Sequence, residues 1–230
     1  MKSLHLSIFI VLLVSSSCGD KKTQEAVSDI TEDLVQTTPV LDNQEKKNRK
    51  TVLFFGDSLT AGFGLDEDES FPALIQERID SLGIDYEVIN AGLSGETTAG
   101  GKGRISWVLN QPIDIFVLEL GANDMLRGLN LDETIKNLKS ILDTYLQENP
   151  DGKVIVAGMQ APPNMGQDYT SRFQGIFERL ASEYEAGFIP FLLDGVAGIP
   201  DLNLEDGKHP NAEGQYIVRD NVWTVLAPYL

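Results

Sequence analysis

Histidine and cysteine are scarce in this chain, whose 230 residues include two histidines and one cysteine. A single cysteine excludes an internal disulfide and a zinc site built from thiolates. Positive charge is also in deficit, since 18 Lys and Arg stand against 35 Asp and Glu and give a formal net charge of −17. A surface that binds nucleic acid must neutralise phosphates with Lys and Arg. The charge balance therefore argues against nucleic acid as a partner.

Apolar residues are plentiful enough for a core: they make up 42% of the chain, which excludes a wholly disordered protein. The N-terminus carries Lys2, an apolar run over 4–14 and three serines that lead to Cys18. The run is far shorter than the roughly 20 residues that span a bilayer. This pattern predicts a signal peptide over 1–17 rather than a transmembrane helix.

Small residues directly before a cysteine resemble the lipobox of bacterial lipoproteins, in which that cysteine is acylated. The resemblance predicts lipidation of Cys18 and an exported, membrane-anchored lipoprotein facing the periplasm or the cell surface. The alternative is an ordinary cleaved signal and a soluble periplasmic or secreted protein. Residues 18–49 are polar, acidic and free of aromatic residues. This composition predicts a flexible tether. The alternative is a short packed helix over 26–35. In either case the lipid on Cys18 is the only contact with a membrane that we expect.

From residue 50 to the C-terminus, short apolar runs alternate with longer stretches of helical periodicity. This alternation predicts βαβ units and a three-layer α/β/α domain over 50–230, with a central, mostly parallel five-stranded sheet. Ligands of such sheets bind outside the carboxyl ends of the strands. The expected strands are 51–55, 86–90, 113–120, 153–158 and 187–193, and the expected helices are 71–82, 98–110, 131–147, 169–184 and 211–226.

Segments that follow four of these strands carry the residue types that acyl transfer requires. These are a serine nucleophile, a histidine base with an aspartate near it, and glycine and asparagine donors for an oxyanion. Because His5 lies in the predicted signal peptide, His209 is the only imidazole left in the mature chain. Taken singly, each residue has an ordinary structural explanation, such as a serine N-cap or a turn glycine. The segments are 56–60, 90–97, 121–124 and 206–211.

Four short blocks within these segments resemble, in order, those of the SGNH-hydrolase (GDSL-esterase) family: G-D-S-L, N-x-G-x-S-G-E-T, G-A-N-D and D-G-x-H-P-N. The run over 119–128 resembles the branch with bacterial arylesterases, lysophospholipases and acyl-thioesterases. The resemblance covers 51 to the C-terminus and implies a flavodoxin-like fold without cofactor or metal. It implies Ser58 as nucleophile, His209 as base and Asp206 behind it, with Ser58, Gly95 and Asn123 as oxyanion donors. Asp57 is expected to be structural, satisfying turn amides.

The implied function is a serine esterase that hydrolyses acyl and aryl esters through an acyl-enzyme, with lysophospholipids and acyl thioesters as further substrates. Apolar side chains in the loops are candidates for an acyl groove. One alternative is a carbohydrate O-acetylesterase, which needs polar and aromatic groove walls. A non-enzymatic alternative is a surface lipoprotein that binds lipid or glycan. The candidate groove residues are Leu93, Met125, Leu126 and Met165.

Overall fold

The computed structural model of the protein describes residues 49–230. The signal peptide predicted over 1–17, the lipidation predicted at Cys18 and the tether up to residue 48 lie outside the described residues. Within residues 49–230, we find no helix with the length and apolar character that crossing a membrane requires.

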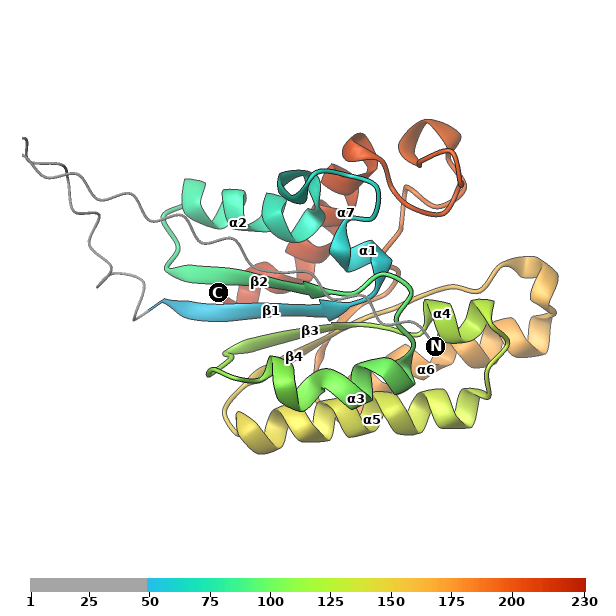
Figure 1. The fold of residues 1–230 in the computed structure, drawn as a ribbon, viewed down its shortest axis with the longest axis horizontal. Coiled ribbons are helices and arrows are strands. Elements are labelled where there is room, and N and C mark those ends of the chain that lie inside the picture. The colour runs from blue at the N-terminus through green and yellow to red at the C-terminus, as the bar shows by residue number, and fades with distance from the viewer. Residues whose placement is uncertain (1–48) are drawn as a thin grey trace, which may run out of the picture. The chain divides into compact units, whose positions relative to one another are not determined.

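The centre of the domain is a sheet of five strands in the order β2-β1-β3-β4-β5 (Figure 1). All neighbouring strands are parallel. Parallel strands are covered on both faces, which explains why all residues of β1 after Lys50 are buried. The predicted α/β fold is confirmed, and the strand order is that of flavodoxin-like doubly wound sheets. The strands are β1 (Lys50–Gly56), β2 (Tyr86–Gly92), β3 (Ile115–Glu119), β4 (Lys153–Ala157) and β5 (Gly187–Ile189).

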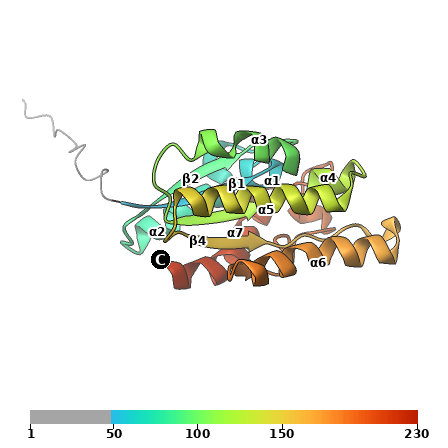
Figure 2. The same cartoon turned by 90° about the horizontal axis from the view of Figure 1, so that it is seen from below.

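Two layers of helices cover the sheet, as Figures 1 and 2 show. Successive strand residues point to opposite faces, so Val52 and Phe54 pack on one layer while Leu53 and Phe55 pack on the other. The first layer consists of α2 (Phe71–Ser81) and α7 (Ala212–Leu226). The second consists of α3 (Thr98–Val108), α5 (Leu131–Glu148) and α6 (Gln167–Glu183). Short 3-10 turns complete the chain: η2 (Glu67–Glu69), η3 (Pro163–Met165), η4 (Pro200–Leu202) and η5 (Ala227–Tyr229).

The fifth strand is shorter than predicted, because it ends at Ile189 rather than at residue 193. Pro190 follows it and has no N–H to donate to a ladder. The chain then turns, and the Leu192 N–H donates to the Gly158 carbonyl at 3.0 Å. The apolar residues after Pro190 are therefore part of a loop at the carboxyl end of the sheet.

Two short helices were not predicted: α1 (Ser58–Ala61) directly after β1, and α4 (Ala122–Leu126) directly after β3. The long helices that follow β1 and β3, α2 and α5, lie on opposite faces of the sheet. The adjacent carboxyl ends of these two strands therefore form the switch point at which doubly wound sheets bind ligands.

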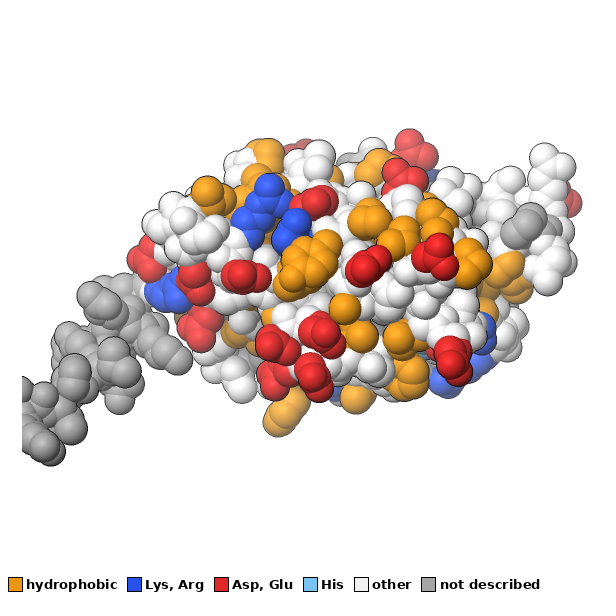
Figure 3. Space-filling view, turned by 90° about the horizontal axis from the view of Figure 1, so that it is seen from above, with side chains coloured by type: hydrophobic (Ala, Val, Ile, Leu, Met, Phe, Trp, Pro, Cys, Tyr) orange, Lys and Arg blue, Asp and Glu red, His pale blue; other side chains and the backbone are white. Residues whose placement is uncertain are grey.

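The face that carries α2 and α7 shows the acidic composition of the chain. Figure 3 shows Asp and Glu side chains spread across this face among apolar ones. The Arg78 guanidinium of α2 pairs with the Asp220 carboxylate of α7 at 2.8 Å. Such an exposed pair contributes little to stability. The exclusion of nucleic acid stays a prediction that rests on charge.

Candidate active site

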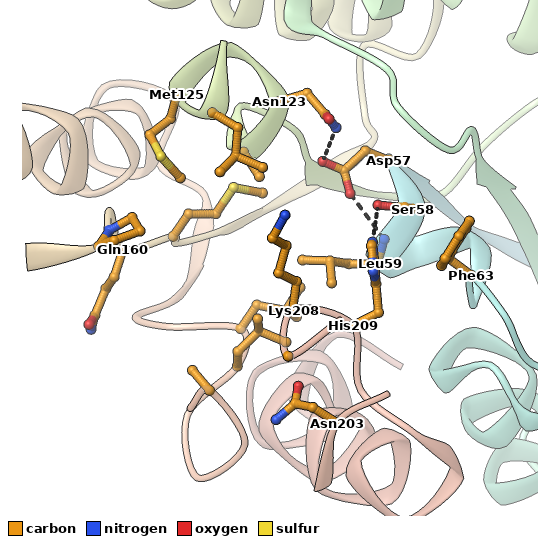
Figure 4. Close-up of a pocket in the computed structure, with 18 of the residues that line it drawn as sticks. Asp57, Ser58, Leu59, Phe63, Asn123, Met125, Gln160, Asn203, Lys208 and His209 are labelled. Atoms are coloured by element: carbon orange, nitrogen blue, oxygen red, sulfur yellow. Dashed lines mark hydrogen bonds between the residues drawn. The ribbon is translucent and has the colours of Figure 1, made fainter. Parts of the chain in front are cut away.

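A chain of hydrogen bonds joins Asp206, His209 and Ser58 at the carboxyl edge of the sheet (Figure 4). His209 Nδ1 lies 2.5 Å from Asp206 Oδ2, and His209 Nε2 lies 2.9 Å from Ser58 Oγ. The hydrogen bond from His209, followed by that from the Lys208 backbone N–H, lowers the pKa of Asp206 to about 2. An ionised carboxylate only accepts hydrogen bonds, so Nδ1 carries the proton and the Nε2 lone pair faces the Ser58 hydroxyl.

The local backbone structure sets the positions of Ser58 and His209. Ser58 is the first residue of α1, and Asp57 caps the helix by accepting the Leu59 N–H at 3.0 Å. His209 lies in the loop before α7, and its carbonyl accepts the Leu204 N–H at 2.8 Å. Its ring packs against the ring of Phe63, with the ring centres 4.6 Å apart.

The residues of the three donors implied by the resemblance, Ser58, Gly95 and Asn123, line one cavity together with His209. The Ser58 N–H is in the first position of a helix and has no intrahelical acceptor. The Gly95 N–H donates no hydrogen bond within residues 49–230. Gly95 has a φ of 78°, a conformation that glycine adopts freely. The Arg127 guanidinium donates to the Gly95 carbonyl at 2.7 Å and holds this peptide in place.

The third donor, the Asn123 side-chain amide, is oriented by Asp57. Asn123 Nδ2 donates to Asp57 Oδ2 at 3.0 Å. An amide nitrogen carries two hydrogens, so this bond leaves one N–H for an oxyanion. Asp57 does satisfy a turn amide as predicted, but its second role, in fixing Asn123, was missed because it depends on a contact between α1 and α4.

Asp124 ties the segment that carries Asn123 to the start of α3. Its carboxylate is buried and accepts the Thr98 N–H at 2.8 Å and the Thr98 hydroxyl at 2.5 Å. The Thr134 hydroxyl of α5 donates to it at 3.2 Å. The loop with Gly95 and the helix with Asn123 are therefore held in one hydrogen-bonded unit.

The carboxyl group of Glu119 is also buried, and it lies next to the turn from β1 into α1 that carries Asp57 and Ser58. Its Oε2 accepts the Asp57 N–H at 3.1 Å and the Thr60 hydroxyl at 2.7 Å, while its Oε1 has no partner within residues 49–230. Only glycine fits at position 56, because a Cβ there would lie 2.0 Å from Thr60 Oγ1 and 2.5 Å from Glu119 Oε2. Glu119 therefore sets the path of the chain from β1 into α1.

Burial raises the pKa of Glu119 well above its ordinary value, and the neighbouring Asp57 raises it further. Burial also raises the pKa of Asp57 to about 6, against the hydrogen bonds from Leu59 and Asn123 that lower it. The neutral acid of Glu119 is therefore favoured up to a higher pH than that of an exposed glutamate. Glutamine has nearly the same shape as glutamic acid and no ionisable proton, so the variant Glu119→Gln tests this effect of burial.

We expect Glu119→Gln to reduce the loss of stability that the wild type undergoes as the pH rises above about 4.3. An unfolded glutamate releases its proton near its ordinary pKa of about 4.3, whereas folded Glu119 keeps its proton to higher pH. The folded state therefore binds more protons in this range, and the free energy of unfolding falls as the pH rises. Glutamine has no proton to lose. Urea denaturation of both proteins at several pH values measures the difference.

The matched control is Glu119→Ala, which removes the acceptor of the Asp57 N–H and the Thr60 hydroxyl. It is expected to lower the free energy of unfolding by about 1–3 kcal/mol at both ends of the pH range. Equal pH dependence in the wild type and in Glu119→Gln would show that Glu119 is ionised in the folded protein.

A cavity of about 440 Å³ opens beside Ser58 and His209. Met125 and Leu126 line it, in line with their prediction as groove residues. Leu93 is not among its lining residues, because it lies over a separate hollow beside Trp107. Met165 is not among them either, because it packs against the core on the α5 and α6 side. Neither residue lines this cavity, and their place in an acyl groove stays a prediction.

Sequence reasoning missed several lining residues of this cavity. Met159 and Gln160 follow β4, and the general rule that ligands bind at carboxyl ends of strands was enough to single them out. Phe191 belongs to the loop that was predicted as strand. Phe63 and Lys208 carried no recognisable signal, since the first follows a helix of four residues and the second occupies a variable position of its block.

The chain is similar in sequence and in structure to several known proteins. Residues 54–217 match the sequence model of the GDSL-like Lipase/Acylhydrolase family. The protein named Esterase TesA of Pseudomonas aeruginosa is 37% identical over 182 residues, which cover 79% of this chain and 90% of that protein. The Escherichia coli K12 protein named Thioesterase 1/protease 1/lysophospholipase L1 is 33% identical over 179 residues, 77% of this chain and 84% of that protein. The solved structure titled Crystal Structure of TesA superposes with a TM-score of 0.75 at 37% identity, covering 79% of this chain and 100% of that chain.

Proposed function

Because the chain belongs to the GDSL-like lipase/acylhydrolase family and is an ester hydrolase, we propose that it hydrolyses carboxylic esters with Ser58 as nucleophile and His209 as base. Asp206 orients the base. The observation that carries this proposal is the hydrogen-bond chain from Asp206 through His209 to Ser58 Oγ, which opens onto the cavity. The proposed reaction steps follow from the hydrogen bonds of the Ser58 hydroxyl and the His209 ring.

The Ser58 hydroxyl attacks the ester carbonyl while its proton passes to His209 Nε2, 2.9 Å away. The imidazolium that forms is stabilised by the Asp206 carboxylate, which stays ionised because its pKa is lowered to about 2. The imidazolium then protonates the departing alcohol, and an acyl-enzyme remains on Ser58. His209 next takes a proton from the water that attacks the acyl-enzyme. As the bond to Ser58 Oγ breaks and the acid leaves, the imidazolium returns this proton to Ser58 Oγ, which restores the free enzyme.

Negative charge develops on the carbonyl oxygen in both steps. The Ser58 N–H, the Gly95 N–H and the second N–H of the Asn123 amide are the donors that we assign to it. Donors of this kind are most effective when they are fixed before the reaction. Arg127 fixes the Gly95 peptide and Asp57 fixes the Asn123 amide, so the donors need little reorganisation.

The cavity favours acyl and aryl esters as substrates. Its wall is largely apolar and includes Leu59, Met125, Leu126 and Met159. Methionine and leucine side chains adapt to ligands of different shape. The printed name of the Escherichia coli relative includes thioesterase and lysophospholipase, which supports lysophospholipids and acyl thioesters as further substrates.

A carbohydrate O-acetylesterase is the second candidate, and the cavity wall supports it more than the sequence did. Phe63 is 47% exposed beside His209, and Phe191 and Gln160 also line the cavity. Exposed aromatic rings next to an amide group are suitable surfaces for a sugar ring. Acetyl specificity would then replace tolerance of longer chains.

The test is a series of p-nitrophenyl esters from acetate to decanoate, with acetylated xylan as a carbohydrate substrate. We expect the highest kcat/KM with acyl chains longer than acetyl and no release of acetate from xylan. A maximum at acetate together with release of acetate from xylan favours the second candidate. No hydrolysis of any ester would contradict both.

We also propose that the chain is exported and anchored in a membrane by a lipid on Cys18. The support is the apolar run over 4–14, the serines that precede the cysteine and the absence of any other cysteine in the sequence. Dual acylation gives stable anchoring, whereas a single chain binds a membrane only marginally.

Cys18→Ser is expected to move the protein from the membrane fraction to the soluble exported fraction and to abolish incorporation of labelled palmitate. Cysteine occurs once in the sequence, so labelling by a thioether-linked lipid has one acceptor site. Retention of Cys18→Ser in the membrane fraction would overturn the lipid anchor.

A further inference from the structure

Lys208 lies between Asp206 and His209 in the sequence, and its side chain lines the cavity. Its backbone N–H donates to Asp206 Oδ1 at 2.9 Å, which fixes the start of the side chain. Figure 4 shows the side chain extending into the cavity with its nitrogen at the far end. A flexible cation therefore stands within the site, one residue from the base.

The Lys208 ammonium has no ionic partner in the part of the chain that the structure describes. Asp57 is the carboxylate among the lining residues, and it is 1% exposed. The Asp57 oxygens already accept the Leu59 N–H and the Asn123 amide. The lining of the cavity thus contains a cation without an available counter-charge.

The surroundings of this cation decide which ligand suits it. Met125, Leu126 and Met159 make much of the wall apolar. Lys208 is an exposed residue, so its ammonium is hydrated when no ligand is bound. A neutral ester on the apolar wall leaves this cation unpaired, whereas an anionic ester pairs with it.

We propose that the cavity selects carboxylic esters that carry a phosphate or carboxylate group near the reacting carbonyl, and that Lys208 binds this anionic group. This inference rests on the proposed esterase function of the same cavity. The substrate class is an anionic amphiphile, with an acyl chain on the apolar wall and a negative charge at Lys208. The overall charge of −17 repels anions, so a local cation is needed to admit them.

Two pairs of esters test the proposal, because the anion can lie on either side of the ester bond. For the alcohol side, lysophosphatidic acid is compared with the monoacylglycerol of the same chain. For the acyl side, the p-nitrophenyl half-ester of adipic acid is compared with p-nitrophenyl hexanoate. The quantity measured is the ratio of kcat/KM for the anionic ester to that for its neutral partner.

Lys208→Met keeps an unbranched side chain and removes the charge. We expect it to lower the ratio by about twofold to fivefold in at least one pair, mainly through KM, as suits a solvated ion pair. Lys208→Arg is expected to keep the ratio. Because Lys208 adjoins His209, a change in the base would affect both esters alike and cancel in the ratio.

Lys102→Met is the matched control, since Lys102 is an exposed lysine of α3 and does not line the cavity. It changes the net charge equally and is expected to leave both the ratio and the basal activity unchanged. Added salt screens the ion pair, so 0.5 M NaCl is expected to lower the ratio for the wild type more than for Lys208→Met.

The pair in which the ratio falls shows which side of the ester carries the anion. An unchanged ratio for Lys208→Met in both pairs overturns the role of Lys208, and the esterase function stands if the wild type hydrolyses the neutral esters and Ser58→Ala does not. If the wild type hydrolyses none of the four esters, the proposed function fails, and this inference fails with it.

Discussion

Ser58→Ala is expected to lower kcat for p-nitrophenyl butyrate by about 10⁵-fold, because Ser58 carries the cavity-lining hydroxyl that is hydrogen-bonded to the His209 imidazole. Removal of the nucleophile or base of such a unit costs about 10⁴–10⁶-fold in related chemistry, and the remaining activity comes from the oxyanion donors and binding. His209→Ala is expected to cost a similar factor, since Nε2 is the group that accepts the Ser58 proton. Steady-state kinetics with a burst-phase assay measures both losses.

The double variant Ser58→Ala/His209→Ala provides the control for a shared role. When two residues act as one catalytic unit, removal of either already abolishes the contribution of both. The double variant is therefore expected to be no slower than either single variant. In the described part of the chain the Ser58 hydroxyl bonds only to His209, so Ser58→Ala is expected to keep the wild-type thermal midpoint within a few degrees. Wild-type turnover in Ser58→Ala would contradict the assignment of the nucleophile.

The long elements could be predicted from the sequence because they carry many apolar residues at regular spacing. The helix α5 repeats buried side chains such as Leu138, Ile141 and Tyr145 over 18 residues, and such a pattern leaves little ambiguity. The helices α1 and α4 have four and five residues. Fewer than two turns cannot show a 3.6-residue period, so their existence depends on contacts formed only in the fold.

The candidate site was predictable where its parts are close in the sequence. Asp206 and His209 are three residues apart, and their pairing could be expected from one loop. The bond between Ser58 and His209 joins residues 151 positions apart. Before the fold was known, it was suggested by the carboxyl ends of the predicted strands and by the resemblance to a family.

The cavity wall was less predictable, because the direction of a loop side chain depends on backbone angles that composition does not show. Leu93 precedes the left-handed turn at Gly95 and lies over another hollow. Phe191 lies in the cavity wall because β5 ends before Pro190. Asp57 was understood only as a turn residue, since its bond to Asn123 joins residues 66 positions apart.

Asn123→Ala is expected to lower kcat by about 10²–10³-fold with little change in KM. In the proposed mechanism the Asn123 amide donates to the oxyanion of the transition state and does not contribute to the binding of the neutral ester. The loss corresponds to about 3–4 kcal/mol of transition-state stabilisation. Kinetics with p-nitrophenyl butyrate measures the change, and a large rise in KM at unchanged kcat would contradict a role in the transition state.

The role of Asp57 as the residue that positions Asn123 can be separated from its role as helix cap. Asp57→Ser keeps an N-cap side chain for α1 but is too short to replace the bond to Asn123 Nδ2. We expect it to lower kcat in the wild-type background and to have little further effect in the Asn123→Ala background, because it acts through the amide that is already missing. A double-mutant cycle in kcat measures this coupling. Additive losses would mean that Asp57 acts on the reaction independently of Asn123. Its effect would then pass through the turn from β1 into α1, where its N–H donates to Glu119 and the next residue is Ser58.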